Sequence, residues 1–212
     1  MMTTAESRAT RPSRRDVQAA ATRDDIVEAA TRLMLDGGYI LTSISAIARE
    51  ANVAVQTIYN SIGNKAELLS VVLDRLAVGP EAPALEPDVL RFRVAQARTR
   101  SQVITVMTDW FVEVNQRTAR INQVINQAAS VDRDIAEWDE RRSARRLHNY
   151  GEAASSLRVL HGLRSGLSDP EAAAALWSIG HPQIYRSLVV DIGWSADAYR
   201  QWVKTSLTAL LA

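Results

Sequence analysis

The 212-residue chain contains no cysteine. It therefore has no disulfide bond, no thiolate ligand for a metal and no cysteine nucleophile. No apolar run reaches the length of about 18 residues that a membrane-spanning helix needs. Residues 1–18 have no apolar block, so no secretory signal is expected there. Together these absences predict a cytoplasmic protein with no membrane partner.

Sequence signatures of enzymes are also missing. The chain has no glycine-rich phosphate loop and no Gly-x-Ser-x-Gly motif, and its acidic residues are scattered as on a solvated surface. The three histidines, His148, His161 and His181, include no pair at the i, i+4 spacing of a helical metal site. The sequence therefore predicts no enzyme and no cofactor. A metal-responsive protein that uses these histidines remains an alternative.

An excess of charge of one sign is absent as well. The formal net charge is +1, and residues 1–79 carry nine basic and nine acidic side chains. Nucleic-acid binding must therefore depend on the local arrangement of side chains. The one local excess lies in a flexible N-terminal arm expected over residues 1–21 and consists of Arg8, Arg11, Arg14 and Arg15. This arm is either a solvated tail or a segment that orders along DNA.

What the sequence does contain is helical periodicity. Apolar residues recur at helical spacing over residues 22–36, where Thr22 and Asp25 are a candidate capping pair. Gly37 and Gly38 are expected to end this helix. A second helix is expected to begin near Thr42, and a further one after residues 63–64.

Residues 79–87, with three prolines, predict a boundary between a domain at 22–78 and one at 79–212. The second domain shows helical patterns over roughly 88–98, 100–116, 118–129, 132–162, 170–192 and 196–211. No strand alternation with hairpin signals is present. The expected fold is all-α: an N-terminal three-helix domain with a helix-turn-helix, followed by a C-terminal helical bundle.

The segment EANVAVQTIYN, residues 50–60, is ambiguous because four of its side chains are β-branched, which is typical of a strand. Asn52, however, suits the left-handed position that ends a helix. Val53 then suits an apolar plug between two helices, and Ile58 and Ile62 share one face of a short helix. These features favour a helix-turn-helix over a strand.

Residues 22–76 resemble the DNA-binding domain of the TetR family of bacterial transcriptional regulators. The resemblance lies in IVEAATRLMLDGGY and TSISAIAREANVAVQTIYNSIGNKAELL, and it continues in the C-terminal stretch from residue 162 to residue 211. Three departures stand out: Asn52 for a usual glycine, Ala54 for a common serine, and Ser61-Ile62 for an aromatic residue or histidine followed by phenylalanine.

The resemblance implies that the short helix Val55–Ile62 enters the major groove of a double-stranded DNA operator. Gln56 and Asn60 are the candidates for reading base edges, because amide side chains pair with adenine. Hydroxyl groups and the lysine at the start of the next helix are candidates for phosphate contacts. Two of these hydroxyl residues, at positions 42 and 43, either contact DNA or only cap a helix. The predicted DNA-binding set is Thr42, Ser43, Val55, Gln56, Thr57, Tyr59, Asn60 and Lys65.

The resemblance also implies a homodimer built from the last two long helices. Apolar residues repeat at helical spacing there, although such a face can also pack only on its own chain. The predicted dimer interface comprises Leu176, Ile179, Leu188, Tyr199, Trp202, Val203, Ser206, Leu207 and Leu210.

Regulators of this family usually release DNA when a small molecule enters the C-terminal bundle. The expected function is therefore a repressor released from a palindromic operator by an unknown effector; a helical adaptor is the other alternative. Pro182 is expected to kink its helix near Ile179. Residues of mixed character in apolar helices are the pocket candidates: Trp110, Phe111, Asn115, Asn122, Gln123, Asn126, Trp138, His148, Trp177, His181 and Tyr185.

Overall fold

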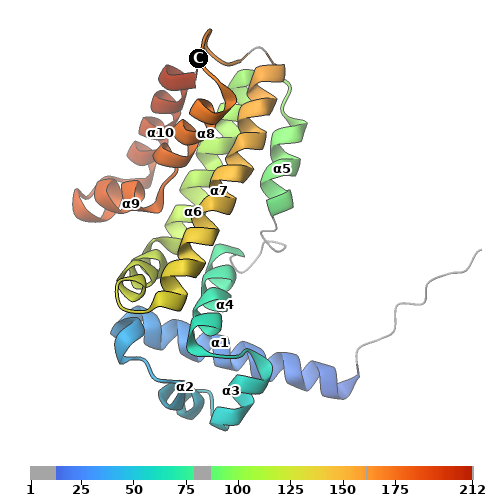
Figure 1. The fold of residues 1–212 in the computed structure, drawn as a ribbon, viewed down its shortest axis with the longest axis vertical. Coiled ribbons are helices and arrows are strands. Elements are labelled where there is room, and N and C mark those ends of the chain that lie inside the picture. The colour runs from blue at the N-terminus through green and yellow to red at the C-terminus, as the bar shows by residue number, and fades with distance from the viewer. Residues whose placement is uncertain (1–12, 79–86, 161, 212) are drawn as a thin grey trace, which may run out of the picture. The chain divides into compact units, whose positions relative to one another are not determined.

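The computed structural model describes residues 13–78, 87–160 and 162–211 (Figure 1). Every regular element in these ranges is helical, as the sequence predicts. The chain divides into two compact units after Leu69. Arg8, Arg11, His161 and the proline-rich segment 79–86 lie outside the described residues.

The first unit contains α1 (Arg14–Leu41), α2 (Ile44–Glu50), α3 (Val55–Ser61) and the start of α4 (Lys65–Val78). Helix α1 begins at Arg14 rather than at Thr22, because Ser13 and Asp16 cap it reciprocally. The Asp16 N–H donates to the Ser13 hydroxyl at 3.2 Å, and the Ser13 N–H donates to the Asp16 carboxylate at 3.0 Å. Residues 14–21, expected in the flexible arm, are therefore helical.

Two backbone positions end the first two helices where the sequence predicts. Gly38 interrupts α1 with φ 75° and ψ 172°. Asn52 has φ 53°, and it follows α2 in a closed turn. There the Val53 N–H donates to the Ala48 carbonyl at 2.9 Å, and the Asn52 N–H donates to the Arg49 carbonyl at 3.2 Å. The segment 50–60 is thus a turn and a helix, and the strand alternative is wrong.

The core of the first unit comes from the apolar faces that the periodicity predicts. Its buried side chains come from each of the four helices and include Ile26, Ala30, Met34, Ile47, Ile58, Leu68 and Leu69. Each large aliphatic side chain buried in this way contributes roughly 1.5–3 kcal/mol to stability relative to exposure. This core fixes the orientation of α3, because Ile58 is fully buried on its inner side.

The second unit contains α5 (Pro87–Gln96), α6 (Arg100–Ala129), α7 (Arg133–Val159), α8 (Asp169–Ile179), α9 (Pro182–Tyr185), the π-helical turn η1 (Arg186–Asp191) and α10 (Ala196–Leu211). Helix α6 is continuous where two helices were expected, because no glycine or proline interrupts residues 100–129. The expected kink in 170–192 is a full break: α8 ends at Ile179 and α9 begins at Pro182. Helices α6, α7, α8 and α10 lie side by side in this unit (Figure 1). No described helix is long and apolar enough to cross a membrane.

The core of the second unit contains several residues of the predicted dimer interface. Leu176, Ile179, Tyr199, Val203 and Leu207 are buried within their own chain. The most apolar face of an amphipathic helix packs on the nearest core, which here belongs to the same chain. Leu188 is partly buried against this core as well. A stripe at i, i+4 and i+8 on α10 retains exposure: Trp202, Ser206 and Leu210.

The break between α8 and α9 is packed against α6. A Cβ atom placed on Gly180 would lie 2.4 Å from Cε1 of Phe111, which is itself buried. The glycine is required there by space, since its φ of −80° suits any residue. In contrast, Gly151 in α7 has nothing within 4 Å of such a Cβ.

We predict opposite effects for alanine at these two glycines. Gly180→Ala should destabilise the protein by about 1–3 kcal/mol, because the Phe111 ring must move within a packed core. Gly151→Ala should stabilise it by about 0.5–1 kcal/mol, because alanine is the better helix former in open space. Urea denaturation at one fixed protein concentration measures both changes. Equal stability of the two variants would contradict the packing at Gly180.

Candidate nucleic-acid interface and ligand cavity

Helix α3 presents a polar outer face. Ile58 anchors its inner side with no exposed surface, while Val55 and Tyr59 are 38% and 48% exposed. Gln56 and Asn60 are exposed and Thr57 is half-buried. The N-cap residue Ala54 makes no side-chain hydrogen bond, so the short helix depends on its buried contacts.

Gln56 and Asn60 act as a pair on this face. The Gln56 amide donates to the Asn60 carbonyl oxygen, with 2.9 Å between Nε2 and Oδ1. The pair keeps the Gln56 carbonyl as an acceptor and the Asn60 amide as a donor. An adjacent acceptor and donor match the N6 and N7 edge of adenine in the major groove.

The start of α4 holds a cation beside the turn that follows α3. Lys65, the first residue of α4, has its ammonium 4.0 Å from the centroid of the buried Tyr39 ring. Asn64 and Glu67 cap this helix: the Glu67 N–H donates to Asn64 Oδ1 at 2.9 Å, and the Asn64 N–H donates to Glu67 Oε2 at 2.7 Å. A lysine placed at a helix N-terminus by an aromatic ring and a cap suits a phosphate contact.

The two hydroxyl residues before α2 differ. Ser43 is exposed and caps α2, where its Oγ accepts from the Ala46 N–H at 3.0 Å. Thr42 is only 4% exposed, and its hydroxyl lies 2.7 Å from the Gly38 carbonyl and 3.1 Å from the Leu33 carbonyl. The Thr42 side chain is thus used inside the fold, and we remove it from the candidate surface.

Ser61 and Arg23 close the end of α3. The Ser61 hydroxyl donates to the Thr57 carbonyl at 2.7 Å, so it is turned into its own helix. The Arg23 guanidinium, on α1, donates to the Ser61 carbonyl. A cation suits the negative end of a helix dipole, and this contact fixes α3 against α1. No sequence signal indicated this role of Arg23, because 38 residues separate the partners.

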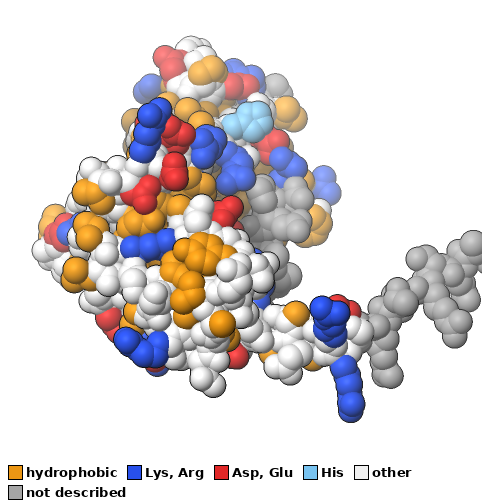
Figure 2. Space-filling view, turned by 60° about the horizontal axis from the view of Figure 1, so that its bottom comes forward, with side chains coloured by type: hydrophobic (Ala, Val, Ile, Leu, Met, Phe, Trp, Pro, Cys, Tyr) orange, Lys and Arg blue, Asp and Glu red, His pale blue; other side chains and the backbone are white. Residues whose placement is uncertain are grey.

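The basic residues form no continuous stripe in the view of Figure 2. Lys and Arg side chains appear there as separate blue spots among white and orange surface. This pattern agrees with the balanced charge of residues 1–79. Any affinity for DNA therefore depends on a few placed contacts more than on a broad basic field.

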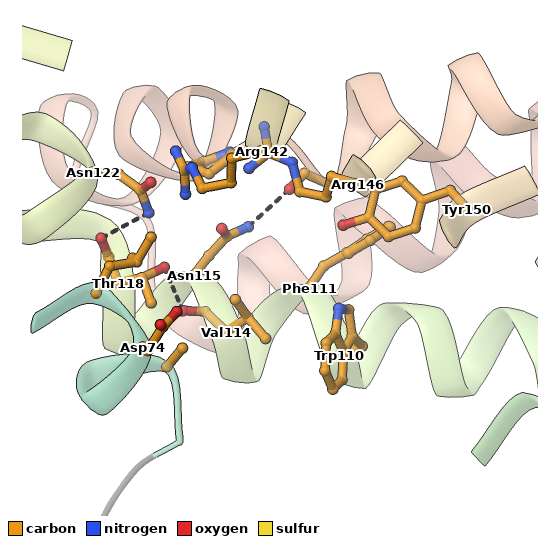
Figure 3. Close-up of a pocket in the computed structure, with 14 residues that line it drawn as sticks. Asp74, Trp110, Phe111, Val114, Asn115, Thr118, Asn122, Arg142, Arg146 and Tyr150 are labelled. Carbon is orange, nitrogen blue, oxygen red and sulfur yellow. Dashed lines mark hydrogen bonds between the residues drawn. The ribbon is translucent and has the colours of Figure 1, made fainter. Parts of the chain in front are cut away.

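The second unit contains a cavity of about 130 Å³, partly open to solvent, between α6, α7, the end of α4 and the break after α8 (Figure 3). One face of α6 contributes Phe111, Asn115, Thr118 and Asn122 at helical spacing, together with Trp110 and Val114. Four of the predicted pocket residues are therefore brought together: Trp110, Phe111, Asn115 and Asn122.

The amide residues of α6 differ in how fully they are bonded. The buried Asn115 donates to the Gly180 carbonyl at 3.2 Å and to the Tyr199 hydroxyl at 3.3 Å. Asn122, only 5% exposed, donates to the Thr118 carbonyl at 2.9 Å. Its own carbonyl oxygen, Oδ1, is buried without a hydrogen-bond partner. A buried acceptor without a partner is costly, so a donor from a ligand would stabilise it.

Helix α7 contributes lining residues that sequence reasoning missed, namely Arg142, Arg146 and Tyr150 at i, i+4 and i+8. Burial raises the pKa of the Tyr150 hydroxyl to about 12, so this group stays neutral. Burial also lowers the pKa of the Arg146 guanidinium. At the rim, burial raises the pKa of Asp74, and the charges of Arg145 and Arg142 oppose that change. The i, i+4, i+8 spacing was a usable signal, but charged residues on a long helix normally indicate a solvated face.

The other pocket candidates do not line this cavity. Gln123 and Asn126 on α6 lie outside its lining, Trp138 packs under Arg142, and His148 is exposed. Trp177 and His181 form an edge-to-face pair, and Tyr185 packs in the same way on Tyr199. His181 caps α9, and burial lowers the pKa of its imidazole. Within the described ranges, no group of three or more histidine or acidic side chains is placed to hold a metal ion.

Comparison with known proteins adds to these observations. Residues 26–72 match the model of the family described as bacterial regulatory proteins, tetR family. The HTH-type transcriptional regulator TtgR of Pseudomonas putida is 28% identical over 204 residues, which cover 91% of this chain and 93% of TtgR.

Solved structures share the fold. NalD, the secondary repressor of the MexAB-OprM multidrug efflux pump in Pseudomonas aeruginosa, matches with a TM-score of 0.74 and 20% identity, covering 92% of this chain and 98% of NalD. SmeT in complex with triclosan matches with a TM-score of 0.70 and 19% identity, covering 91% of this chain and 92% of SmeT.

These matches extend over nearly the whole chain and agree with the turn at Asn52 and the helices that flank it. Residues 26–72 belong to the tetR family of bacterial regulatory proteins, and over nearly its whole length the chain is similar to transcriptional regulators.

Proposed function

We propose that the chain is a repressor that binds a near-palindromic DNA operator as a homodimer and releases it when a small molecule occupies the cavity of the second unit. The outer face of α3 is the observation that carries the DNA-binding part, because Gln56 and Asn60 form an exposed amide pair there. The proposed contact residues are Ser43, Val55, Gln56, Thr57, Tyr59, Asn60 and Lys65.

These residues have separate tasks in the proposal. The amide pair reads a base pair in the major groove, which gives sequence preference. Ser43, Tyr59 and Lys65 contact phosphates, which position the helix but carry no sequence information. Two copies of α3 must then lie about one DNA turn apart, ~34–36 Å, to contact both halves of an operator.

Helix α4 offers a route from the cavity to this surface. Lys65 stands in its first turn, and Asp74 and Ala77 line the cavity nearer its end. A ligand that favours a different position of α4 lowers operator affinity by the difference in its affinity for the two states. The triclosan complex of SmeT, a protein of the same fold, is consistent with an organic effector.

The homodimer is proposed to use the exposed stripe of α10 in place of the buried residues first expected. Leu210 is 46% exposed, and Ser206 and Trp202 lie one and two turns before it. Burial of such an exposed apolar side chain against a second copy stabilises the dimer.

The first test selects genomic fragments bound by the purified protein and titrates the best one at several salt concentrations. Lys65→Gln should weaken all sequences about equally and lower the salt slope by about 2, one phosphate for each half-site. Lys204→Gln is the matched control, because Lys204 is the only other lysine in the chain and lies on α10. Equal slopes for Lys65→Gln and the parent would contradict the phosphate contact.

Gln56→Ala should behave differently from the lysine variant. It should cost about 1–3 kcal/mol on the best operator and relax preference at one base pair of each half-site, while affinity for unrelated DNA stays the same. Competition binding against operators changed at single positions measures this. If the folded parent enriches no site at all, the helical adaptor alternative takes the place of the regulator.

Leu210→Glu should shift the protein from dimer toward monomer, because it places a charge in the proposed interface. Thr208→Glu is the control on another side of α10, where the Thr208 hydroxyl donates to the Lys204 carbonyl at 2.8 Å. Sedimentation velocity over a concentration series measures both masses. An unchanged dimer for Leu210→Glu would remove this stripe from the interface.

A further inference from the structure

The cavity of the second unit contains a cation, Arg146, that forms no ion pair with any residue in the described ranges. Among the described residues, no carboxylate lies within 4.0 Å of the half-buried Arg146 guanidinium, and no hydrogen bond reaches it. Its neighbour Arg142 is already engaged, with Nη2 2.6 Å from the Asp139 carboxylate and the guanidinium stacked over Trp138 at 5.5 Å. A partly desolvated charge without a partner is unfavourable, so an anion at this position would be stabilised.

The cavity presents a second, independent group without a partner. Asn122 Oδ1 is buried and accepts no hydrogen bond, and Asn122 lies on the α6 side of the cavity. Figure 3 places Asn122 and Thr118 at one end of the lining, Trp110 and Tyr150 at the other, and Arg142 and Arg146 along the α7 side. A ligand that pairs with the Arg146 guanidinium and also donates to Asn122 Oδ1 must therefore have an anionic group and a separate hydrogen-bond donor.

The lining residues and the volume of the cavity indicate the size and the polarity of the ligand that fits it. Phe111, Trp110 and Tyr150 supply aromatic surface, and Val114 and Leu73 supply aliphatic surface. The cavity measures about 130 Å³, and an apolar cavity of ~150 Å³ is known to hold one benzene molecule. One aromatic ring therefore fits this volume.

We propose that the effector is a single-ring aromatic carboxylate with a hydroxyl donor, a compound of the hydroxybenzoate class, whose carboxylate pairs with Arg146 and whose hydroxyl donates to Asn122. The ring lies against Phe111 and Trp110. This inference rests on the proposed function only in taking the cavity as the effector site.

Binding of 3- and 4-hydroxybenzoate to the full-length protein, measured by calorimetry without DNA, tests the proposal directly. At least one of the acids should bind about tenfold more tightly than its uncharged amide, 3- or 4-hydroxybenzamide, because hydrogen bonds between charged groups are stronger than those between neutral ones. Equal affinity for acid and amide, or no binding of either acid at millimolar concentration, would overturn the proposal.

Variants locate the two contacts. Arg146→Gln should weaken the acid about tenfold or more and leave the amide unchanged. Arg141→Gln is the matched control on the same helix, where its side chain is 70% exposed and pairs with Glu137. Asn122→Leu should abolish the preference for hydroxybenzoate over benzoate. Parental affinity of Arg146→Gln for the acid, or a retained hydroxyl preference in Asn122→Leu, contradicts the assignment.

Release of the operator, measured separately by fluorescence anisotropy, distinguishes an error in the proposed effector class from an error in the proposed function. If the protein binds an operator and a neutral compound but no acid, the effector class is wrong while the regulator stands. If the acid binds with the expected dependence on Arg146 and no operator is found, the cavity assignment stands and the proposed function falls. The comparison of acid with amide needs no variant, so it holds even if Arg146→Gln folds poorly.

Discussion

The second unit depends on one buried polar side chain, Asn115. A buried amide must find partners, and Asn115 finds them in the Gly180 carbonyl and the Tyr199 hydroxyl. The Gly180 carbonyl is left without a helical partner where α8 ends, because the Gln183 and Ile184 N–H groups, which follow it at i+3 and i+4, donate to the imidazole and the carbonyl of His181. One side chain of α6 thus fixes the break after α8 and the position of α10. The cavity lies beside this junction, so its shape follows from the same hydrogen bonds.

The first unit is organised by apolar contacts, with polar groups confined to its ends. Ile58 holds α3 by its inner side, and Arg23 holds the last carbonyl of that helix. The outward side chains are therefore presented by a helix that cannot rotate without losing a buried isoleucine. With no general excess of positive charge, this fixed presentation is what a specific DNA contact in such a protein requires.

The residues that sequence reasoning placed well are those governed by local chemistry. Asn52 was assigned a left-handed turn because few residues accept that conformation, and its φ of 53° agrees. Phe111 and Asn115, whose mixed character on an apolar helix predicts a pocket, line the cavity, and their contact with a ligand stays a prediction. The residues placed badly depend on partners distant in the chain. The sequence pattern around Arg146 is typical of a solvated helix face, but in the structure Arg146 lines the cavity opposite α6. The pattern around Tyr199 predicts an interface residue, but in the structure Tyr199 is buried in the core of its own chain. The early start of α1 was missed for a local reason, since Ser13 is as good a cap as Thr22.

The left-handed backbone at Asn52 also limits the substitutions that can be accepted at this position. Glycine is the other residue that adopts a φ of 53° without strain, yet no single nucleotide change converts an asparagine codon into a glycine codon. The two-step routes pass through aspartate or serine. Aspartate tolerates the conformation but adds a negative charge beside the turn into α3, and serine carries the full strain of a left-handed backbone. Asparagine at this position is thus held in place by the genetic code as well as by the fold.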